Sequence, residues 1–189
     1  MTLDGTTLND AAIRQLAIRI DRPVVLVGMM GVGKSTVGRK LAALLDLPFA
    51  DADDEIAEAA QLSIPEIFDR FGEEYFRDGE RRVIARLLEE GPSVIATGGG
   101  AFAQDETRAL ILERGLAVWL DSDVETLVDR VSRKDTRPLL RDRDPGEILT
   151  KLKAKRDPLY AEAPIHVTSG KGPHSDTVTR ILGALAECL

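Results

Sequence analysis

Cysteine, histidine and long apolar runs are scarce in this sequence, and each scarcity excludes a class of structure. Cys188 is the 1 cysteine among 189 residues, so no internal disulfide can form. One cysteine and 2 separated histidines also supply no cluster that would bind a transition metal. No apolar run approaches the roughly 18 residues that a membrane-spanning helix needs. The sequence therefore predicts no disulfide, no metal cluster of this kind and no membrane span.

Basic character is lacking as well, both at the amino terminus and overall. The segment "MTLDGTTLNDAAIRQLAIRI" has no basic start followed by an apolar block and a small-residue cleavage site, so it does not resemble a secretory signal. With the scarcity of cysteine, this predicts a cytoplasmic protein. The net charge of −7 disfavours nucleic acid as the main partner. Clustered arginines can still bind a small anion.

The pattern that is present alternates short apolar runs with helical periodicity, which is typical of an α/β domain with a parallel sheet. At 189 residues, we expect one domain over 23–189 and an amino-terminal extension over 1–22. The expected strands are the short apolar runs: Pro23 to Val27, Pro48 to Asp51, Ser93 to Thr97, Leu116 to Leu120 and Ile165 to Ser169.

Apolar stripes predict which helix faces cover the sheet. The stripe after the first strand consists of Val37, Leu41, Leu44 and Leu45, that of the last helix of Val178, Ile181, Leu182 and Leu185, and that of a short amino-terminal helix of Ile13, Leu16, Ile18 and Ile20. Trp119 is expected in the core. The two histidines, His166 and His174, are interpreted as structural or solvent-facing.

A charged, aperiodic segment over about 132–145 is predicted to be a mobile lid. It contains "SRKDTRPLLRDRD". Asp144 as N-cap and Pro145 at the first helical position predict that a helix begins where the segment closes.

The stretch Gly28 to Ser35, "GMMGVGKS", fits the pattern G-x-x-x-x-G-K-[ST] between a predicted strand and a predicted helix. In such a loop, backbone N–H groups and the helix N-terminus converge on phosphate. Lys34 is expected to reach the β- and γ-phosphates, and the Ser35 hydroxyl to bind Mg²⁺. The alternative is a glycine-rich turn with an incidental lysine, which the flanking elements disfavour.

Acidic side chains follow the second expected strand, in "FADADDEI". Asp51 and Asp53 lie two residues apart, and side chains at this spacing share one face of an extended segment. One carboxylate can then support Mg²⁺ while the other accepts a proton from an attacking hydroxyl. Equally, Asp53 or Asp54 can simply cap the following helix.

Two further stretches contain candidate binding residues. "FGEEYFRDGERRV" places Arg77 and Glu80 one helical turn apart, a spacing that by itself is more typical of solvated ion pairs. "ATGGGAF" places Gly98–Gly100 directly after an apolar run. Consecutive glycines cost backbone entropy, so we expect an unusual turn or a close approach to a ligand there rather than an ordinary loop.

Together these stretches resemble shikimate kinases. The residues that carry the resemblance, in order, are "GMMGVGKST", "FADADDEI", "FGEEYFRDGE", "ATGGGAF", "RPLL" and "RDPLY", and they span about Val24 to Leu182. The resemblance implies ATP-dependent phosphorylation of the 3-hydroxyl of shikimate, a step toward chorismate and the aromatic amino acids. It also implies a three-layer α/β/α P-loop fold with a five-stranded parallel sheet in the order 2-3-1-4-5, and a monomer. One departure is Ala57, which stands where the family commonly has glutamate.

The resemblance also implies roles for single residues. Asp53 is the expected base and holds the substrate hydroxyls, while Asp51 and Ser35 are the expected Mg²⁺ site. Substrate binding is assigned to Asp53, Arg77, Glu80, Gly98, Gly99, Gly100 and Arg156. Nucleotide binding is assigned to Gly28, Gly31, Val32, Gly33, Lys34, Ser35, Thr36, Arg130, Arg137 and Lys171. Arg137 is the expected lid arginine and catalytic with Lys34 and Asp53.

Three alternatives remain open at this point. A gluconate kinase shares the phosphate-binding loop but gives no reason for two carboxylate-binding arginines and a glycine triplet. A nucleoside monophosphate kinase needs a pocket for an acceptor base, which these motifs do not describe. A nucleotide-binding regulatory module without catalysis needs neither Asp53 nor Arg137.

Overall fold

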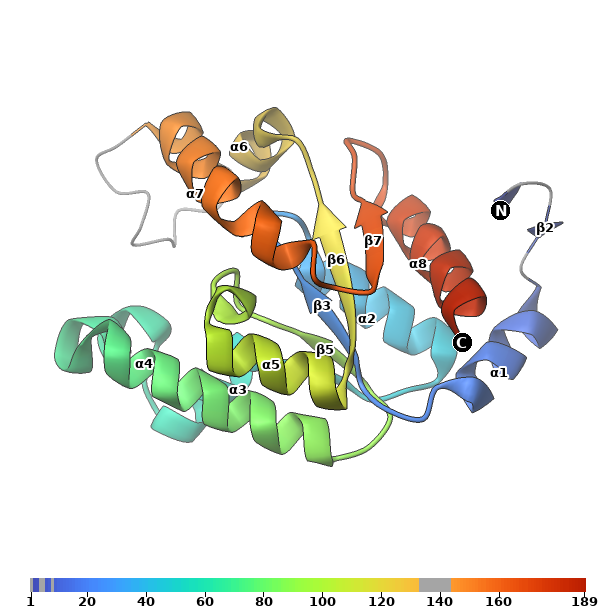
Figure 1. Cartoon of the computed structure of the whole chain (residues 1–189), viewed down its shortest axis with the longest axis horizontal. Coiled ribbons are helices and arrows are strands. Elements are labelled where there is room, and N and C mark those ends of the chain that lie inside the picture. Colours follow the sequence, from blue (N-terminus) through green and yellow to red (C-terminus); the bar gives the residue numbers. More distant parts are fainter. Residues whose placement is uncertain (1, 4–5, 8, 133–143) are drawn as a thin grey trace.

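A five-stranded parallel sheet forms the centre of the molecule (Figure 1). The computed structural model describes residues 2–3, 6–7, 9–132 and 144–189. The strands of the sheet are β3 (Val24–Val27), β4 (Phe49–Asp51), β5 (Val94–Ala96), β6 (Leu116–Asp121) and β7 (Ile165–Thr168). Each lies within one residue of its expected position. Their spatial order is β4-β5-β3-β6-β7, which is the predicted order 2-3-1-4-5.

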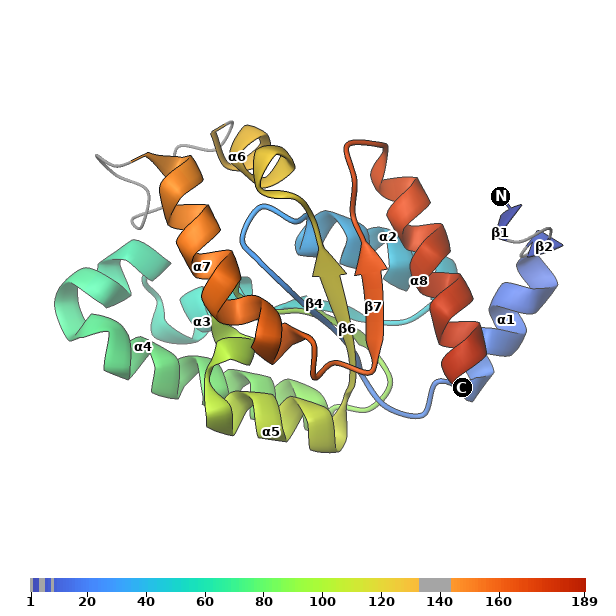
Figure 2. The same cartoon turned by 45° about the horizontal axis from the view of Figure 1, so that its top comes forward.

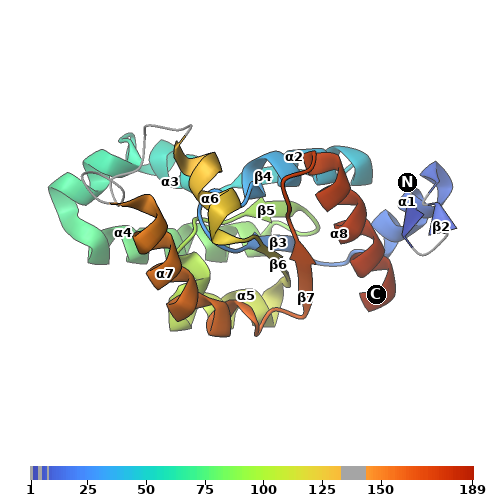
Figure 3. The same cartoon turned by 90° about the horizontal axis from the view of Figure 1, so that it is seen from above.

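Helices cover both faces of this sheet (Figure 3). They are α2 (Lys34–Leu45), α3 (Ala52–Ala60), α4 (Ile64–Glu89), α5 (Asp105–Arg114), α6 (Val124–Ser132), α7 (Pro145–Tyr160) and α8 (His174–Cys188), with the 3-10 helix η1 (Ala101–Ala103) after β5. Helices α2 and α8 lie against one face, and α4 and α5 against the other. The carboxyl ends of all the parallel strands therefore meet at one edge, where ligands bind in folds of this class.

The apolar stripes are buried as predicted in α8 and, with one exception, in α2. Val37, Leu41 and Leu45 are buried, but Leu44 is 51% exposed, so its predicted place in the core is wrong. The buried face of α2 also includes Gly38 and Ala42. At 100° per residue, these small residues shift the centre of the face away from Leu44.

The amino-terminal residues form the predicted short helix, α1 (Asp10–Arg19), preceded by the strand pair β1 (Thr2–Leu3) and β2 (Thr6–Thr7) (Figure 2). Leu16 and Ile20 are buried in the main core. Ile18 is 83% exposed, which contradicts its predicted place in the stripe, because a residue two positions after Leu16 points to the other side of a helix. No helix of the described residues is long and apolar enough to cross a membrane.

Local signals explain where two helices of the site begin. At α4, the Ser63 hydroxyl and the Glu66 carboxylate form a capping box, and the helix is interrupted at Gly72, which has φ 82° and ψ 176°. At α7, the Asp144 side chain accepts a hydrogen bond from Gly146 N–H, and Pro145 occupies the first turn, as predicted. The predicted lid over 132–145 lies mostly outside the described residues.

Candidate active site

The phosphate-binding loop joins the end of β3 to the start of α2. Gly28, Gly31 and Gly33 have φ of 134°, 82° and 101°, a region that favours glycine. At Gly28 a Cβ would lie 2.3 Å from the carbonyl oxygen of Leu120, so the loop passes directly against β6. The positive φ values and this close approach explain why glycine is required at these predicted positions.

Lys34 is buried within this loop. Its Nζ donates hydrogen bonds to the carbonyl oxygens of Gly28 at 2.8 Å and Met29 at 3.0 Å. Ser35 and Thr36 follow in the first turn of α2 and are exposed. A helix N-terminus with an ammonium beside it and two exposed hydroxyls after it is suited to bind an anion such as phosphate.

The acidic pair does not have the predicted extended geometry. Asp51 is the last residue of β4, but Asp53 lies in the first turn of α3. Asp51 is the N-cap of α3, and its Oδ1 accepts a hydrogen bond from Asp53 N–H at 3.1 Å. The prediction that Asp51 and Asp53 share one face of an extended segment is therefore wrong, and so is the alternative that Asp53 or Asp54 caps the helix. A capping turn positions the pair instead.

Gly98 and Gly100 border three charged side chains. A Cβ at Gly98 would lie 2.7 Å from Oε1 of Glu80 and 2.8 Å from Oδ1 of Asp53. A Cβ at Gly100 would lie 2.7 Å from Nη2 of Arg77. Neither approach leaves room for a side chain, so glycine is required at both positions by contacts with these three charged groups of the protein itself. The expected approach of the triplet to a ligand stays a prediction.

Gly99, the middle residue of the triplet, joins two other parts of the site. Its carbonyl oxygen accepts hydrogen bonds from Nη1 of Arg156 at 2.9 Å and from the Tyr160 hydroxyl at 2.6 Å. On its other side, a Cβ would lie 2.9 Å from the backbone N of Met30 in the phosphate-binding loop. Three consecutive glycines thus bring Asp53, both arginines and the phosphate-binding loop to one place.

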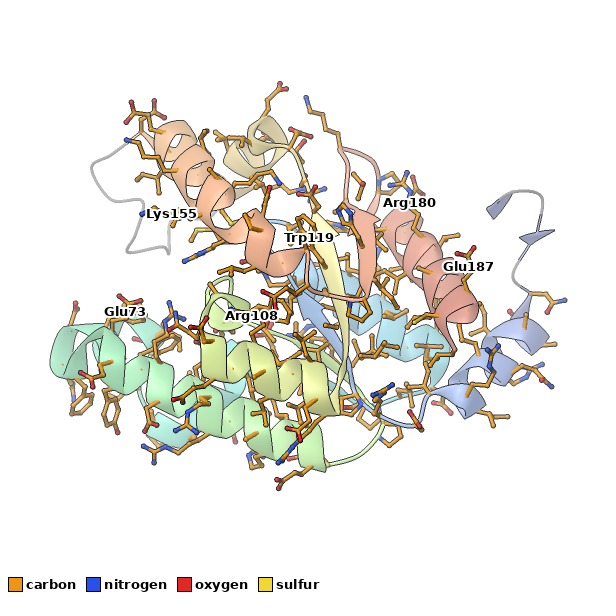
Figure 4. The ribbon with its side chains drawn as sticks, in the orientation of Figure 1. Glu73, Arg108, Trp119, Lys155, Arg180 and Glu187 are labelled. Atoms are coloured by element: carbon orange, nitrogen blue, oxygen red, sulfur yellow. The ribbon has the colours of Figure 1, made fainter. Side chains whose placement is uncertain are left out.

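The ion pair between Arg77 and Glu80 is not the solvated pair that its spacing suggests. Nη1 of Arg77 lies 2.7 Å from Oε2 of Glu80, whose side chain is 1% exposed. Arg77 also pairs with Glu73, which is exposed and lies near the outer end of α4 (Figure 4). The solvated interpretation holds for the pair that Arg77 forms with Glu73.

Burial raises the pKa of Glu80, while the charges of Arg77 and Arg156 act against the rise. The Asp53 carboxylate raises this pKa further, which places Asp53, Glu80 and both arginines within electrostatic reach of one another. Oε1 of Glu80 is buried and has no hydrogen-bond partner in the described part of the chain. Burial lowers the pKa of Arg77, but the charges and hydrogen bonds of Glu80 and Glu73 together outweigh burial and raise the pKa above its usual value. Arg77 is therefore a fixed cation with one guanidinium edge on Glu80.

Tyr160 was part of the motif "RDPLY", but no role was predicted for its hydroxyl. Burial raises its pKa to about 12, so the phenol remains a neutral donor to Gly99 at physiological pH. A polar stripe on α7 was the available signal, because Lys153, Arg156, Asp157 and Tyr160 have helical i, i+3, i+4 and i+7 spacing.

Lys153 anchors α7 to the sheet, and sequence reasoning missed it. Its ammonium pairs with Asp121 at the end of β6 and with Asp157 at 2.8 Å. Trp119, on β6 in the middle of Figure 4, is buried as predicted and stacks on the exposed His166 with a ring distance of 4.1 Å. This anchor fixes the face of α7 that carries Arg156.

On the opposite side of the sheet edge, Arg130 ties the phosphate-binding loop to the segment between β7 and α8. Its guanidinium donates to the carbonyl oxygens of Val32 at 2.9 Å and Gly170 at 2.5 Å, and to the Ser169 hydroxyl at 3.3 Å. Lys171 in the same segment pairs with Glu125 and is exposed. Arg137, the predicted lid arginine, lies outside the described residues.

No three His, Cys, Asp or Glu side chains within residues 9–132 and 144–189 lie close enough together to hold a metal ion by themselves. Mg²⁺ does not require such a cluster when phosphates and water complete its shell. The hydroxyl of Ser35 and the carboxylate of Asp51 are the hard oxygen ligands that it prefers, so the predicted donor set fits this ion.

Comparison with known proteins agrees with this arrangement. The family model described as "Shikimate kinase" matches residues 30–186. A protein from Novosphingobium aromaticivorans named shikimate kinase is 61% identical over 193 residues, with all of both chains covered. One of the same name from Caulobacter vibrioides is 60% identical over 166 residues, which cover 88% of this chain and 83% of that one.

A solved structure is similar as well. The shikimate kinase from Acinetobacter baumannii, determined in complex with shikimate, is 38% identical and superposes with a TM-score of 0.86 over 95% of this chain and 98% of that chain. A family match over most of the chain and full-length identity above 60% lead to one conclusion, which is that this protein belongs to the shikimate kinase family.

Proposed function

We propose that this protein transfers the γ-phosphoryl group of ATP to the 3-hydroxyl of shikimate, giving shikimate 3-phosphate and ADP. The observation that carries the proposal is the convergence of Asp53, Arg77, Arg156 and the phosphate-binding loop on Gly98–Gly100. Shikimate has a carboxylate at one end and hydroxyls at the other. The site offers matching groups for both ends beside a place for phosphate.

The two arginines are the expected carboxylate clamp. Nη1 of Arg77 donates a hydrogen bond to the Glu80 carboxylate, and Nη1 of Arg156 donates one to the Gly99 carbonyl oxygen. The protein therefore orients each guanidinium. A planar guanidinium binds a carboxylate through charge-assisted hydrogen bonds of about 1.5–3 kcal/mol each. Glu80 acts as a positioning residue, because its buried carboxylate holds Arg77 in place.

Asp53 is the expected base for the substrate hydroxyl. Its carboxylate lies beside Gly98, on the same side of the triplet as Glu80, and its backbone is fixed by the cap from Asp51. In this role the attacking hydroxyl donates a hydrogen bond to Asp53 and transfers its proton as the new O–P bond forms and the bond to ADP breaks. Little covalent work remains for the protein, so positioning supplies most of the acceleration.

The phosphate-binding loop and Lys34 are the expected site of the nucleotide. Lys34 then exchanges its contacts with the Gly28 and Met29 carbonyls for the β- and γ-phosphates. Ser35 and Asp51 would hold Mg²⁺, which neutralises charge on the phosphates when it is bound. Arg137 and the lid over 132–145 remain the predicted cover that excludes water. A monomer over one domain at 23–189 also remains a prediction.

The test of this function is ADP release, measured in a coupled assay with shikimate, gluconate or AMP as the acceptor. We expect turnover with shikimate and none above the ATP-only background with the other two. Turnover with gluconate or AMP and not with shikimate would contradict the proposal. ATP binding without turnover on any acceptor would favour a regulatory module instead.

Gly100→Ala is expected to weaken shikimate binding about tenfold, with a smaller effect on the KM for ATP. The added methyl group would lie 2.7 Å from Nη2 and 3.0 Å from Nη1 of Arg77. Arg77 cannot move away without leaving Glu80 buried and unpaired, which costs about 1–3 kcal/mol. Isothermal titration with shikimate measures the change.

Gly79→Ala is the matched control for this variant. Gly79 lies in α4 two residues after Arg77, and apart from its chain neighbours and the backbone of its own helix, no described atom lies within 4 Å of its added Cβ. Alanine there is expected to leave shikimate binding unchanged and to stabilise the helix by up to about 1 kcal/mol. Equal shikimate affinity in both variants would contradict the role given to Arg77.

A further inference from the structure

Pro158 lies inside α7, two residues after Arg156, and interrupts the hydrogen bonding of this helix. Proline has no backbone N–H, so the carbonyl group of Ala154, four residues earlier, loses the hydrogen bond that it would accept in a regular helix. The proline ring also crowds that carbonyl group and favours a kink. Arg156 lies between these two residues. Its position therefore depends on contacts that α7 makes with other elements.

Lys153 supplies such contacts from the preceding turn of α7. Its ammonium pairs with Asp121, at the end of β6, and with Asp157 at 2.8 Å. The pair with Asp157 joins positions i and i+4 of the helix and so spans the turn that contains Arg156. The ammonium also lies 5.9 Å from the centre of the Trp119 ring on β6. Two carboxylates and an aromatic face thus hold one cation, which fixes this turn against the strand.

The charge of Lys153 is what compensates Asp157. Oδ2 of Asp157 is paired with the ammonium, and Oδ1 is buried without a hydrogen-bond partner in the described part of the chain. Burial lowers the pKa of Lys153, but the hydrogen bonds and charges of Asp121 and Asp157 outweigh burial and raise it above the usual value. A partly buried carboxylate that loses its cation is costly. Without the ammonium, the turn is expected to move until water reaches Asp157.

The strand that receives Lys153 also borders the phosphate-binding loop. Asp121 directly follows Leu120 in β6, and a Cβ at Gly28 would lie 2.3 Å from the carbonyl oxygen of Leu120. Lys153 therefore connects the helix that carries Arg156 to the strand that lies against the loop. The two ends of the proposed reaction site, the carboxylate clamp and the phosphate site, are joined through this one side chain.

We propose that Lys153 is a positioning residue for shikimate, because its ion pairs with Asp121 and Asp157 set the guanidinium of Arg156 relative to the phosphate-binding loop. Lys153 acts through Arg156 and touches neither substrate. This inference rests on the function proposed above and adds to the site a residue that lies outside it. A wild-type protein that does not phosphorylate shikimate contradicts the proposed function. A wild-type protein that does, together with a Lys153 variant of unchanged shikimate affinity, contradicts this inference alone.

The first test measures shikimate affinity by titration followed by ¹H NMR. Lys153→Met removes the charge and keeps a long side chain, and it is expected to bind shikimate about tenfold more weakly with ADP affinity unchanged. Lys153→Arg keeps a cation between the carboxylates and is expected to lie within about threefold of the wild type. Lys151→Met is the matched control, since Lys151 is exposed on the same helix and pairs only loosely with Glu147 at 3.5 Å. Equal affinity in Lys153→Met and Lys151→Met overturns the proposal.

The second test separates positioning of Arg156 from a general loss of stability. If Lys153 acts through Arg156, adding Lys153→Met to Arg156→Lys is expected to weaken shikimate binding by less than about twofold further. The drop in Tm caused by Lys153→Met is expected to be the same in both backgrounds. A further tenfold loss of affinity in the Arg156→Lys background overturns the proposal, because Lys153 would then act independently of Arg156.

Asp121→Asn tests the same bridge from the strand, and it keeps the proposal falsifiable if Lys153→Met does not fold. The change leaves Lys153 and Asp157 in place and removes the charge at the end of β6. Shikimate binding is expected to weaken by about threefold to tenfold, again with little further effect in the Arg156→Lys background. Wild-type affinity in Asp121→Asn would mean that the connection to β6 does not position Arg156.

Discussion

Asp53→Asn is expected to lower shikimate-dependent ADP release by about 10²–10⁴-fold while leaving the affinity for ATP within about twofold. Asparagine has the shape of aspartate but does not accept a proton, and general-base catalysis is worth about this factor. The change leaves Asp51 as the cap of α3, so the fold of this turn is retained. Single-turnover kinetics and titration with ATP measure the two effects separately.

Asp54→Asn is the matched control, since it changes the neighbouring carboxylate in the same helix. Asp54 is exposed and pairs with Arg39 at 3.4 Å. An exposed pair of this kind contributes little, so we expect activity within about twofold of the wild type. Turnover of Asp53→Asn within about tenfold of the wild type would remove Asp53 from the role of base.

Arg156→Lys is expected to weaken shikimate binding about 10–100-fold. Lysine keeps the charge but loses the planar fork, and it does not hold the Gly99 carbonyl as Nη1 does. The loss of one charge-assisted hydrogen bond, about 1.5–3 kcal/mol, corresponds to this change in affinity. Arg156 is not among the residues assigned to the nucleotide, so the KM for ATP is expected to change little. Steady-state kinetics with each substrate varied in turn shows the difference.

Lys155→Ala controls for a general change in charge on α7. Lys155 is exposed and adjacent to Arg156 in sequence (Figure 4). We expect shikimate affinity close to that of the wild type. A loss as large in Lys155→Ala as in Arg156→Lys would mean that long-range charge attracts shikimate and that no specific clamp is present.

Features that depend on contiguous residues were predictable from the sequence. The phosphate-binding loop is one example, since Gly28, Gly33 and Lys34 are fixed by local backbone geometry. Strand positions and the buried face of α8 follow from short-range periodicity in the same way. The order of the strands came from the family resemblance, because periodicity does not determine which strands are neighbours.

Features that depend on the crossing of distant elements were not predictable. Glu80 has the spacing of a surface ion pair, and only the packing of α4 against the glycine triplet buries it. Asp53 was expected on an extended segment because it lies two residues after Asp51 in either conformation, so the sequence spacing does not reveal the capping turn at Asp51. The contact of His174 with Gly33 joins residues 141 positions apart, and no pattern in either segment indicates it.

The position of the phosphate on the product tests most directly whether the arginines orient shikimate toward the nucleotide. The protein is incubated with ATP, Mg²⁺ and shikimate, and the product is analysed by ³¹P and ¹H NMR. If Arg77 and Arg156 hold the carboxylate while Asp53 receives the reacting alcohol, the phosphate appears on the 3-hydroxyl alone. A mixture of phosphorylated hydroxyls, or ADP formed with inorganic phosphate and no phosphoester, would contradict this account.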